Sequence, residues 1–276
     1  MSYVEVGKEN GAPINSHYED HGSGLPIVLI HGFPFSGRAW EKQETILLDA
    51  GYRVITYDRR GFGDSSQPSE GYDYDTFVAD LDTLLTHLDL RDIVLVGHSM
   101  GTGEVTHYLG TKGSDRVRKG VLVSAIPPFL LKTDDNPNAA DKSLFTNIKK
   151  SILNDRFAYL SDFNDDFFNP DENLGKSVSQ EALDAHWNIA TGASPKGTHD
   201  CVDAWLTDFR DDLPKIDVPI LIIHGDADRV LPYDITAKLL PDKIKDAKLV
   251  TVEGGPHGIC WTHPEIVNKE LLEFIN

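Results

Sequence analysis

Cysteine is scarce in this chain of 276 residues, which contains only Cys201 and Cys260. Two cysteines are too few for a disulfide framework, and their spacing does not form the CxxC pattern of a metal or redox site. No histidine pair offers a convincing metal site either, because His17 and His21 lie in a segment that alternates like a strand. We therefore expect two ordinary buried thiols and no metal site at these residues.

Basic residues are also few, with 26 lysines and arginines against 44 aspartates and glutamates, a net charge of −18. Such a balance disfavours nucleic acids and anionic membranes as partners. Long apolar runs are missing too, since no stretch approaches the roughly 18 residues of a membrane span. The N-terminal sequence MSYVEVGKEN has no basic start followed by an apolar run. The sequence predicts a soluble, cytoplasmic protein.

What the chain does contain is a regular alternation of apolar runs, bounded by turn residues, with segments of helical period. This pattern is typical of βα units and a mainly parallel sheet. Residues 2–8 and 14–20 instead alternate polar and apolar side chains, which predicts an antiparallel hairpin at a sheet edge. Buried strands are expected at 26–30, 52–57, 92–96, 120–124, 218–225 and 247–252, and helices at 38–49, 74–88, 101–111, 234–240 and 264–275. The prediction is an eight-stranded sheet with helices on both faces.

The alternation stops between Pro127 and about Asp212. This stretch has no convincing buried strand, is rich in Asp and Asn, and contains many aromatic residues. A run of about 85 residues between two strands is too long for a bare loop in a compact protein. We expect a helical cap at 127–212 inserted into a single domain, whose core is formed by residues 1–126 and 213–276.

The segment IVLVGHSMGTGE at 93–104 places Ser99 in a GxSxG motif. A match to this motif alone is weak, but here it follows a buried strand and opens a helix. Gly97 and Gly101 would let strand and helix approach closely while the serine adopts a strained backbone conformation. Ser99 is therefore the candidate nucleophile, in preference to a serine that only caps the following helix.

A serine hydroxyl needs a base to take its proton and an acid to orient that base. In this fold class both follow the serine, with the acid first. His224 lies inside a strand and is expected to be structural, and His263 precedes Pro264 at a helix start and is expected to cap it. His257, in the loop GGPHGI after the last strand, is the expected base.

For the acid, the turn after VPILIIHG offers Asp226 and Asp228. Both lie beyond the carboxyl end of a strand, where open α/β sheets build their sites. Physical reasoning alone does not choose between them. One should bond His257, and the other should brace the turn by accepting backbone amides.

An oxyanion hole needs two backbone N–H groups aimed at the place where negative charge develops. The residue after the nucleophile, Met100, supplies one, and the loop HGFPFSG at 31–37 makes Phe33 the candidate for the other. Pro34 has no N–H and is expected to shape this loop. Phe33, Pro34, Met100, Trp205 and Val230 are the predicted lining of the substrate pocket.

Six segments together resemble the cofactor-free bacterial haloperoxidases, or perhydrolases, of the α/β-hydrolase superfamily. They are HGFPFSGRAW, VITYDRRGFGDSSQP, VLVGHSMGTGEV, AWLTDFRDDL, PILIIHGDADRVLP and GGPHGI. The resemblance spans most of the chain. It implies the α/β-hydrolase fold, Ser99 as nucleophile, His257 as base, Asp228 as acid, and no metal or haem. His98, the residue before the serine, departs from the family pattern. Haloperoxidase relatives often have Phe at this position, whereas ordinary esterases often have His.

The implied function is that of a serine hydrolase acting on small carboxylic esters through an acyl-enzyme. Hydrogen peroxide in place of water would give a peracid, which oxidises halide in solution. The expected partners are a small ester or carboxylic acid and hydrogen peroxide, with a homo-oligomer as a candidate state. The alternatives are an amidase or lactamase acting on small cyclic or aryl amides, and a small-ligand receptor with vestigial hydrolase activity. Sustained turnover, as opposed to one burst, separates the enzyme from the receptor.

Overall fold

The structure, a computed structural model, describes residues 2–276 and is built on one mixed sheet of eight strands. Each strand is a short run of apolar or alternating residues ended by a turn or a helix, as the sequence pattern predicts. The strands are β1 (Ser2–Glu9), β2 (Ala12–Gly22), β3 (Pro26–Ile30), β4 (Arg53–Tyr57), β5 (Ile93–His98), β6 (Val117–Val123), β7 (Ile220–Gly225) and β8 (Ala247–Val252).

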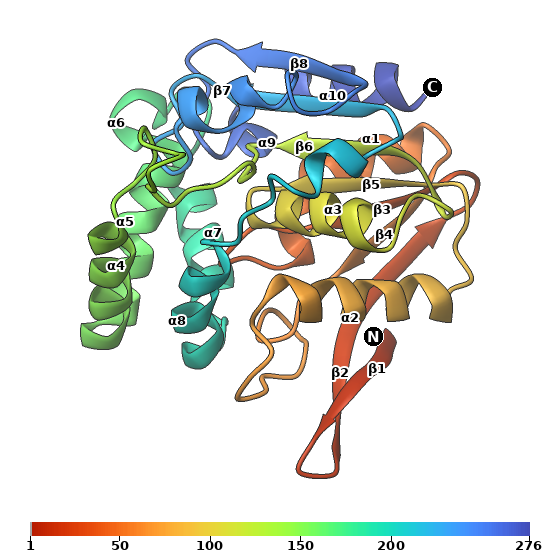
Figure 1. Cartoon of the computed structure of the whole chain (residues 1–276), viewed down its shortest axis with the longest axis horizontal. Helices are drawn as coiled ribbons and strands as arrows, with labels where there is room; N and C mark the ends of the chain where they lie inside the picture. Colours follow the sequence, from red (N-terminus) through yellow and green to blue (C-terminus); the bar gives the residue numbers. More distant parts are fainter. Residues whose placement is uncertain (1) are drawn as a thin grey trace.

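The strand order across the sheet is β1-β2-β4-β3-β5-β6-β7-β8. The β1–β2 and β2–β4 pairs are antiparallel, and every other neighbouring pair is parallel. The predicted N-terminal hairpin is therefore confirmed, and it extends the edge of the parallel sheet (Figure 1). Because the strands from β3 to β8 run in one direction, the loops at their carboxyl ends meet along one edge.

Helices separate the strands along the chain and cover both faces of the sheet, as predicted. The α2 and α3 helices bury apolar residues against one face, in a cluster that includes Leu81, Leu84 and Val105. On the other face, α1 and α10 contribute Leu47, Val267 and Leu271 to a second cluster. The helices outside residues 127–212 are η1 (Gly37–Trp40), α1 (Glu41–Asp49), α2 (Tyr74–His87), α3 (Met100–Thr111), η2 (Leu213–Lys215), η3 (Tyr233–Ile235), η4 (Ala237–Leu239), α9 (Ile259–Thr262) and α10 (Pro264–Ile275).

Residues 127–212, which we call the cap segment, hold five helices between β6 and β7. These helices gather at one end of the molecule, at the left of Figure 1, beyond the sheet. Their aromatic residues form cores of their own, with Phe35 joining Leu160, Phe167 and Phe168. The helices are α4 (Lys142–Asn154), α5 (Arg156–Phe168), α6 (Pro170–Asn173), α7 (Gln180–Thr191) and α8 (Pro195–Ala204).

Two local predictions differ from the structure. The helix expected at 234–240 is two separate 3-10 turns, η3 and η4, broken at Thr236, whose hydroxyl bonds the Pro232 carbonyl. His263 occupies the N-cap position of α10, but its side chain does not cap the helix and contacts the Thr262 hydroxyl instead. In both places a local side-chain hydrogen bond competes with regular helical bonding.

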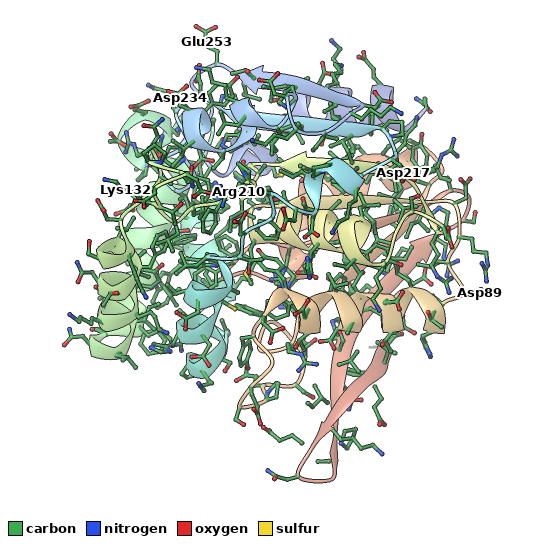
Figure 2. The ribbon with its side chains drawn as sticks, viewed as in Figure 1. Asp89, Lys132, Arg210, Asp217, Asp234 and Glu253 are labelled. Carbon is green, nitrogen blue, oxygen red and sulfur yellow. The ribbon has the colours of Figure 1, made fainter. Side chains whose placement is uncertain are left out.

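The two thiols and the surface agree with the sequence. Cys201 and Cys260 are both buried and unpaired. Charged side chains such as Asp89, Asp217, Asp234 and Glu253 project outward from the fold (Figure 2). Within residues 2–276, no helix combines the length and the apolar character needed to cross a bilayer.

Candidate active site

Ser99 lies in the tight turn between β5 and α3, with φ of 54° and ψ of −120°. A non-glycine residue in this conformation is strained and persists only where its surroundings enforce it. A Cβ at Gly97 would collide with the Gly101 carbonyl, and one at Gly101 would collide with the Ile30 carbonyl. The two glycines thus permit the close strand–helix approach that the motif predicts, and the turn presents the Ser99 side chain at the carboxyl edge of the sheet.

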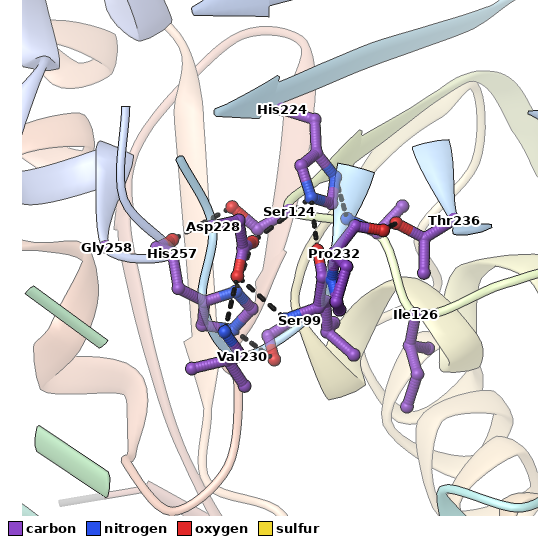
Figure 3. Close-up of polar contacts among 12 residues, drawn as sticks. Ser99, Ser124, Ile126, His224, Asp228, Val230, Pro232, Thr236, His257 and Gly258 are labelled. Carbon is purple, nitrogen blue, oxygen red and sulfur yellow. Dashed lines mark hydrogen bonds and ion pairs between the residues drawn. The ribbon is translucent and has the colours of Figure 1, made fainter. Parts of the chain in front are cut away.

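Three side chains from separate loops form one hydrogen-bond chain (Figure 3). The Ser99 hydroxyl donates to Nε2 of His257 over 2.8 Å, and Nδ1 of His257 donates to Oδ2 of Asp228 over 2.7 Å. All three residues are buried, and His257 is fully enclosed. The structure therefore brings together the serine, the histidine and the second aspartate of GDAD. Such an arrangement lets the ring take a proton from the hydroxyl while the carboxylate fixes its tautomer.

Asp228 is held in place by more than His257. Its Oδ1 atom accepts the backbone N–H groups of Val230 at 2.9 Å and Leu231 at 2.7 Å. Nε2 of His224 lies 3.1 Å from Oδ2. Burial alone would raise the pKa of the Asp228 carboxyl, but His257 and His224 outweigh it and hold that pKa well below its usual range. Asp228 is therefore ionised at neutral pH.

His224, expected to be structural, connects two parts of the site. Its Nδ1 atom accepts the Ala125 N–H at 3.0 Å, which leaves the proton on Nε2. Nε2 lies 2.9 Å from the Leu231 carbonyl and also faces Asp228. Sequence reasoning placed His224 correctly in a strand but missed this contact with the acid, because no local pattern brings together a strand residue and a residue of the turn that follows.

Asp226, the other acid candidate, bonds elsewhere. Its Oδ1 atom accepts the N–H of Gly254 at 2.7 Å, in the loop that leads to His257. It thus braces a neighbouring loop through a backbone amide. Of the two aspartates, Asp228 and not Asp226 bonds the His257 ring in the structure.

The backbone carbonyl of His257 has two donors of its own. The Ser124 hydroxyl donates over 2.9 Å, and Nε2 of His98 donates over 3.1 Å. Burial and the charge of the nearby His257 ring lower the pKa of His98 to about 3, so His98 is neutral at physiological pH. The residue that departs from the family pattern therefore acts on the position of the His257 loop.

A cavity of about 320 Å³ opens above Ser99 and reaches under the cap segment. Phe33, Met100, Trp205 and Val230 are among its lining residues. Pro34, which the sequence analysis also expects there, is not one of its lining residues. Pro34 is buried, and the Phe33 ring forms this wall of the cavity by packing against Trp205 with ring centroids 4.8 Å apart. Throughout residues 2–276, the N–H groups of Phe33 and Met100 have no hydrogen-bond acceptor.

The cap segment touches the site directly through α5. The Phe167 ring packs edge-on against the His257 ring, with centroids 5.0 Å apart. The Phe167 carbonyl accepts the N–H of Gly258 at 2.8 Å. The histidine loop is thus held between the sheet edge and the cap segment, and the cavity is the approach to Ser99.

A buried charge cluster supports the loop that carries Phe33. The Arg59 N–H donates to Nε2 of His31 at 3.0 Å, and its guanidinium donates to the His31 carbonyl at 2.8 Å. Glu104 pairs with the same guanidinium and accepts the Tyr57 hydroxyl. Sequence reasoning assigned no role to this cluster. Glu104 lies in the first turns of the helix that follows Ser99. A buried acid needs a charged or hydrogen-bonding partner, and the sequence alone does not show which residue supplies it.

Two groups of side chains in the described part of the chain are spaced closely enough to bind a metal ion. In the first, His17, Asp58 and Asp64, the Asp58 carboxylate already accepts the N–H groups of Gly37 and Asp64. The second, Glu19, His21 and Glu44, is largely exposed. Neither group borders the cavity that contains Ser99.

Comparison with known proteins assigns this fold to a family. Residues 26–264 match the family model described as the alpha/beta hydrolase fold. The chain belongs to the α/β-hydrolase family. Within that superfamily it belongs with the cofactor-free bacterial haloperoxidases, as the resemblance of its motifs implies.

Three relatives define this neighbourhood. A candidate non-haem chloroperoxidase of Synechocystis sp. is 64% identical over 275 residues, which cover 100% of each chain. The bifunctional esterase/perhydrolase of Acinetobacter calcoaceticus is 35% identical, with 100% of this chain and 99% of that protein covered. The crystal structure of the bromoperoxidase from Bacillus anthracis superimposes with a TM-score of 0.95, at 49% identity and with 99% of each chain covered.

Proposed function

We propose that this protein is a serine hydrolase that cleaves small carboxylic esters through an acyl-enzyme, and that it also transfers the acyl group to hydrogen peroxide. The observation that supports this most strongly is the buried chain from Ser99 through His257 to Asp228, open to a cavity at the serine. The names of the esterase/perhydrolase and haloperoxidase relatives agree with the same chemistry.

In the acylation step, the Ser99 oxygen attacks the ester carbonyl while its proton passes to Nε2 of His257. The bond from Ser99 Oγ to the carbonyl carbon forms, and the bond to the alkoxy group breaks. His257 returns its proton to the leaving oxygen, which departs as an alcohol. Asp228 remains ionised and stabilises the protonated ring.

Developing negative charge on the carbonyl oxygen needs two donors in the dry site. We assign them to the N–H groups of Phe33 and Met100, which border the cavity and lack acceptors within residues 2–276. Arg59 and Glu104 hold the Phe33 loop from below.

Deacylation reverses these steps with a different nucleophile. Water gives the carboxylic acid, and hydrogen peroxide gives the peracid; in each case His257 takes the proton and Ser99 is regenerated. A released peracid can transfer one oxygen to a halide ion, which forms hypohalite while the peracid is reduced to the carboxylic acid. Halide oxidation on this scheme takes place in solution and needs no halide site.

We further propose that residues 127–212 act as a cap that shapes the acyl pocket within a single domain. Phe163 of α5 and Trp205, just after α8, both contact Phe33 beside the serine. The cytoplasmic location and the oligomeric state stay predictions.

A paired assay tests the proposal. One short aryl ester is supplied to the protein, first alone and then with hydrogen peroxide and bromide, and aryl alcohol release and dye bromination are measured. We expect sustained ester cleavage and peroxide-dependent bromination, both lost in Ser99→Ala. Full ester turnover by Ser99→Ala would contradict the proposal. Cleavage without bromination would remove its perhydrolase half.

A further inference from the structure

The cavity above Ser99 has an apolar interior. Aliphatic and aromatic side chains from the loop after β6, from the cap segment and from the loop after β7 form its walls, including Ile126, Leu130, Phe145, Ile148, Leu231 and Ile235. A volume of about 320 Å³ lies at the lower end of the range for small-molecule sites. Such walls favour an apolar acyl or alcohol group, because a charge buried among them would lose its hydration.

Three charged residues complete the lining: Asp162, Asp166 and Arg229. All three are exposed and therefore lie where the cavity meets solvent. Asp162 and Asp166 are four residues apart on α5, on one side of that helix. Among residues 2–276, neither carboxylate forms an ion pair within 4 Å or a side-chain hydrogen bond.

The charge of Asp166 is not neutralised by its surroundings. Burial raises the pKa of this carboxyl, Arg229 lowers it, and Asp165 and Asp162 raise it further. The carboxylate thus faces the partly dry cavity beside other negative charges.

Arg229 is the one cation on the cavity wall within the described residues, and its guanidinium is already occupied. It donates to both carboxylate oxygens of Asp171, at 2.8 and 3.0 Å, and to Glu172 at 3.1 Å. The cavity lining therefore contains two carboxylates, those of Asp162 and Asp166, against a single guanidinium that is already paired with two further carboxylates. The net charge of −18 adds to the same negative field.

We propose that Asp162 and Asp166 are specificity-determining residues that select neutral acyl donors and discriminate against donors carrying a negative charge. This inference rests on the proposed function, since it concerns the substrate of the same serine. The discrimination has two parts: the apolar walls penalise any buried charge, and the two carboxylates add a repulsion that acts on anions alone.

A matched pair of substrates separates these effects. The p-nitrophenyl esters of pentanoic acid and of glutaric acid differ in that a terminal carboxylate replaces a methyl group. At low salt and pH 7.5 we expect the pentanoate to have the larger kcat/KM. Asp162→Asn and Asp166→Asn should each raise kcat/KM for the glutarate ester by roughly 2- to 5-fold, with little change for the pentanoate. Glu181→Gln, an exposed position on α7 of the same cap segment but outside the cavity lining, is the control and should change neither.

Salt gives an independent readout that a structural disturbance would not imitate. At about 1 M salt the Debye length falls to about 3 Å, so wild-type discrimination should shrink toward that of the double variant Asp162→Asn/Asp166→Asn. Equal kcat/KM for the two esters, or discrimination unchanged in both variants and in salt, would overturn the inference. A preference for the glutarate ester that is abolished by Arg229→Gln would also overturn it, because Arg229 would then be an anion anchor. Absence of pentanoate turnover would instead refute the proposed function itself.

Discussion

Asp226 and Asp228 are the same residue type two positions apart, yet the fold gives them different partners. Asp228 contacts the His257 ring, whereas Asp226 contacts the amide of Gly254. The sequence predicts that an acid stands in this turn, because the site needs one. Physical reasoning from the residues does not choose between them, because turn geometry decides the direction of each side chain; only the family resemblance implies Asp228.

The two aspartates can be separated by matched amide substitutions. Asp228→Asn should lower kcat for a neutral ester by about 10⁴-fold, because an amide presents the wrong hydrogen-bonding pattern to the His257 tautomer. Asp226→Asn keeps the acceptor oxygen for Gly254 and should retain most of the activity. Steady-state kinetics on both purified variants checks this, and a larger loss in Asp226→Asn would reverse the assignment.

His98 provides a milder test at the same scale. His98→Phe removes one of the two donors to the His257 carbonyl while Ser124 keeps the other. One neutral hydrogen bond contributes about 0.5–1.5 kcal/mol, so kcat should fall no more than about tenfold. The acid limb of the pH–rate profile should stay in place, since the pKa of His98 is about 3. A shift of that limb by a full unit in His98→Phe would show that His98 titrates with catalysis.

Among the elements, strands were predicted well because buried apolar runs identify them directly. Pro26–Ile30 and Ala247–Val252 have the predicted ends, but the expectation that 247–252 is a buried strand is wrong, because β8 is an edge strand in which only Val252 is buried. The β6 strand starts three residues before the predicted 120. Two of its first three residues, Arg118 and Lys119, are charged, so composition hides the place of this segment in the sheet. The Arg59–Glu104 pair was not predicted for a related reason. Pairing across elements depends on the fold, which local periodicity does not contain.

His107 of α3 joins three elements and makes a prediction about pH. Nδ1 donates to Asp212 at 2.6 Å and Nε2 donates to Asp75 at 2.8 Å, which links α3 to α2 and to the turn before β7. Burial lowers the pKa of His107, but the two carboxylates outweigh it and raise the pKa above its ordinary value. A raised pKa stabilises the fold fully below the unfolded value of about 6.5, and this contribution is lost as pH rises through the folded value.

Urea unfolding measures this contribution. The loss of unfolding free energy in His107→Gln should be larger at pH 6 than at pH 9.5. His21→Gln is the control, because His21 is exposed and its closest carboxylate, that of Glu19, lies 3.8 Å away. A loss in His107→Gln that stays constant or grows toward pH 9.5 would contradict the charge assignment.

For the whole molecule, the eight-stranded sheet explains why residues distant in sequence meet. Ser99, Asp228 and His257 follow β5, β7 and β8, and the parallel direction of these strands brings their carboxyl ends to one edge. The alternation of strands and helices predicts this edge. The cavity and its charged mouth depend on how the cap segment packs, and aromatic composition alone does not specify that packing.

The whole fold also protects both thiols. Cys201 and Cys260 are buried, and burial raises the pKa of each thiol. A thiol reagent such as 5,5′-dithiobis(2-nitrobenzoate) should therefore react with neither in the native protein and with two per chain in denaturant. Rapid modification of one thiol in the native state would show that the fold opens near that cysteine.

The central claim is that Ser99 is the nucleophile, and covalent trapping tests it most directly. A fluorophosphonate, which reacts with activated serines, should add once per chain, and peptide mass spectrometry should locate the adduct on Ser99. Ester turnover should fall in step with labelling, and Ser99→Ala should take no label. An adduct on another residue, or full turnover after Ser99 is completely modified, would contradict the account.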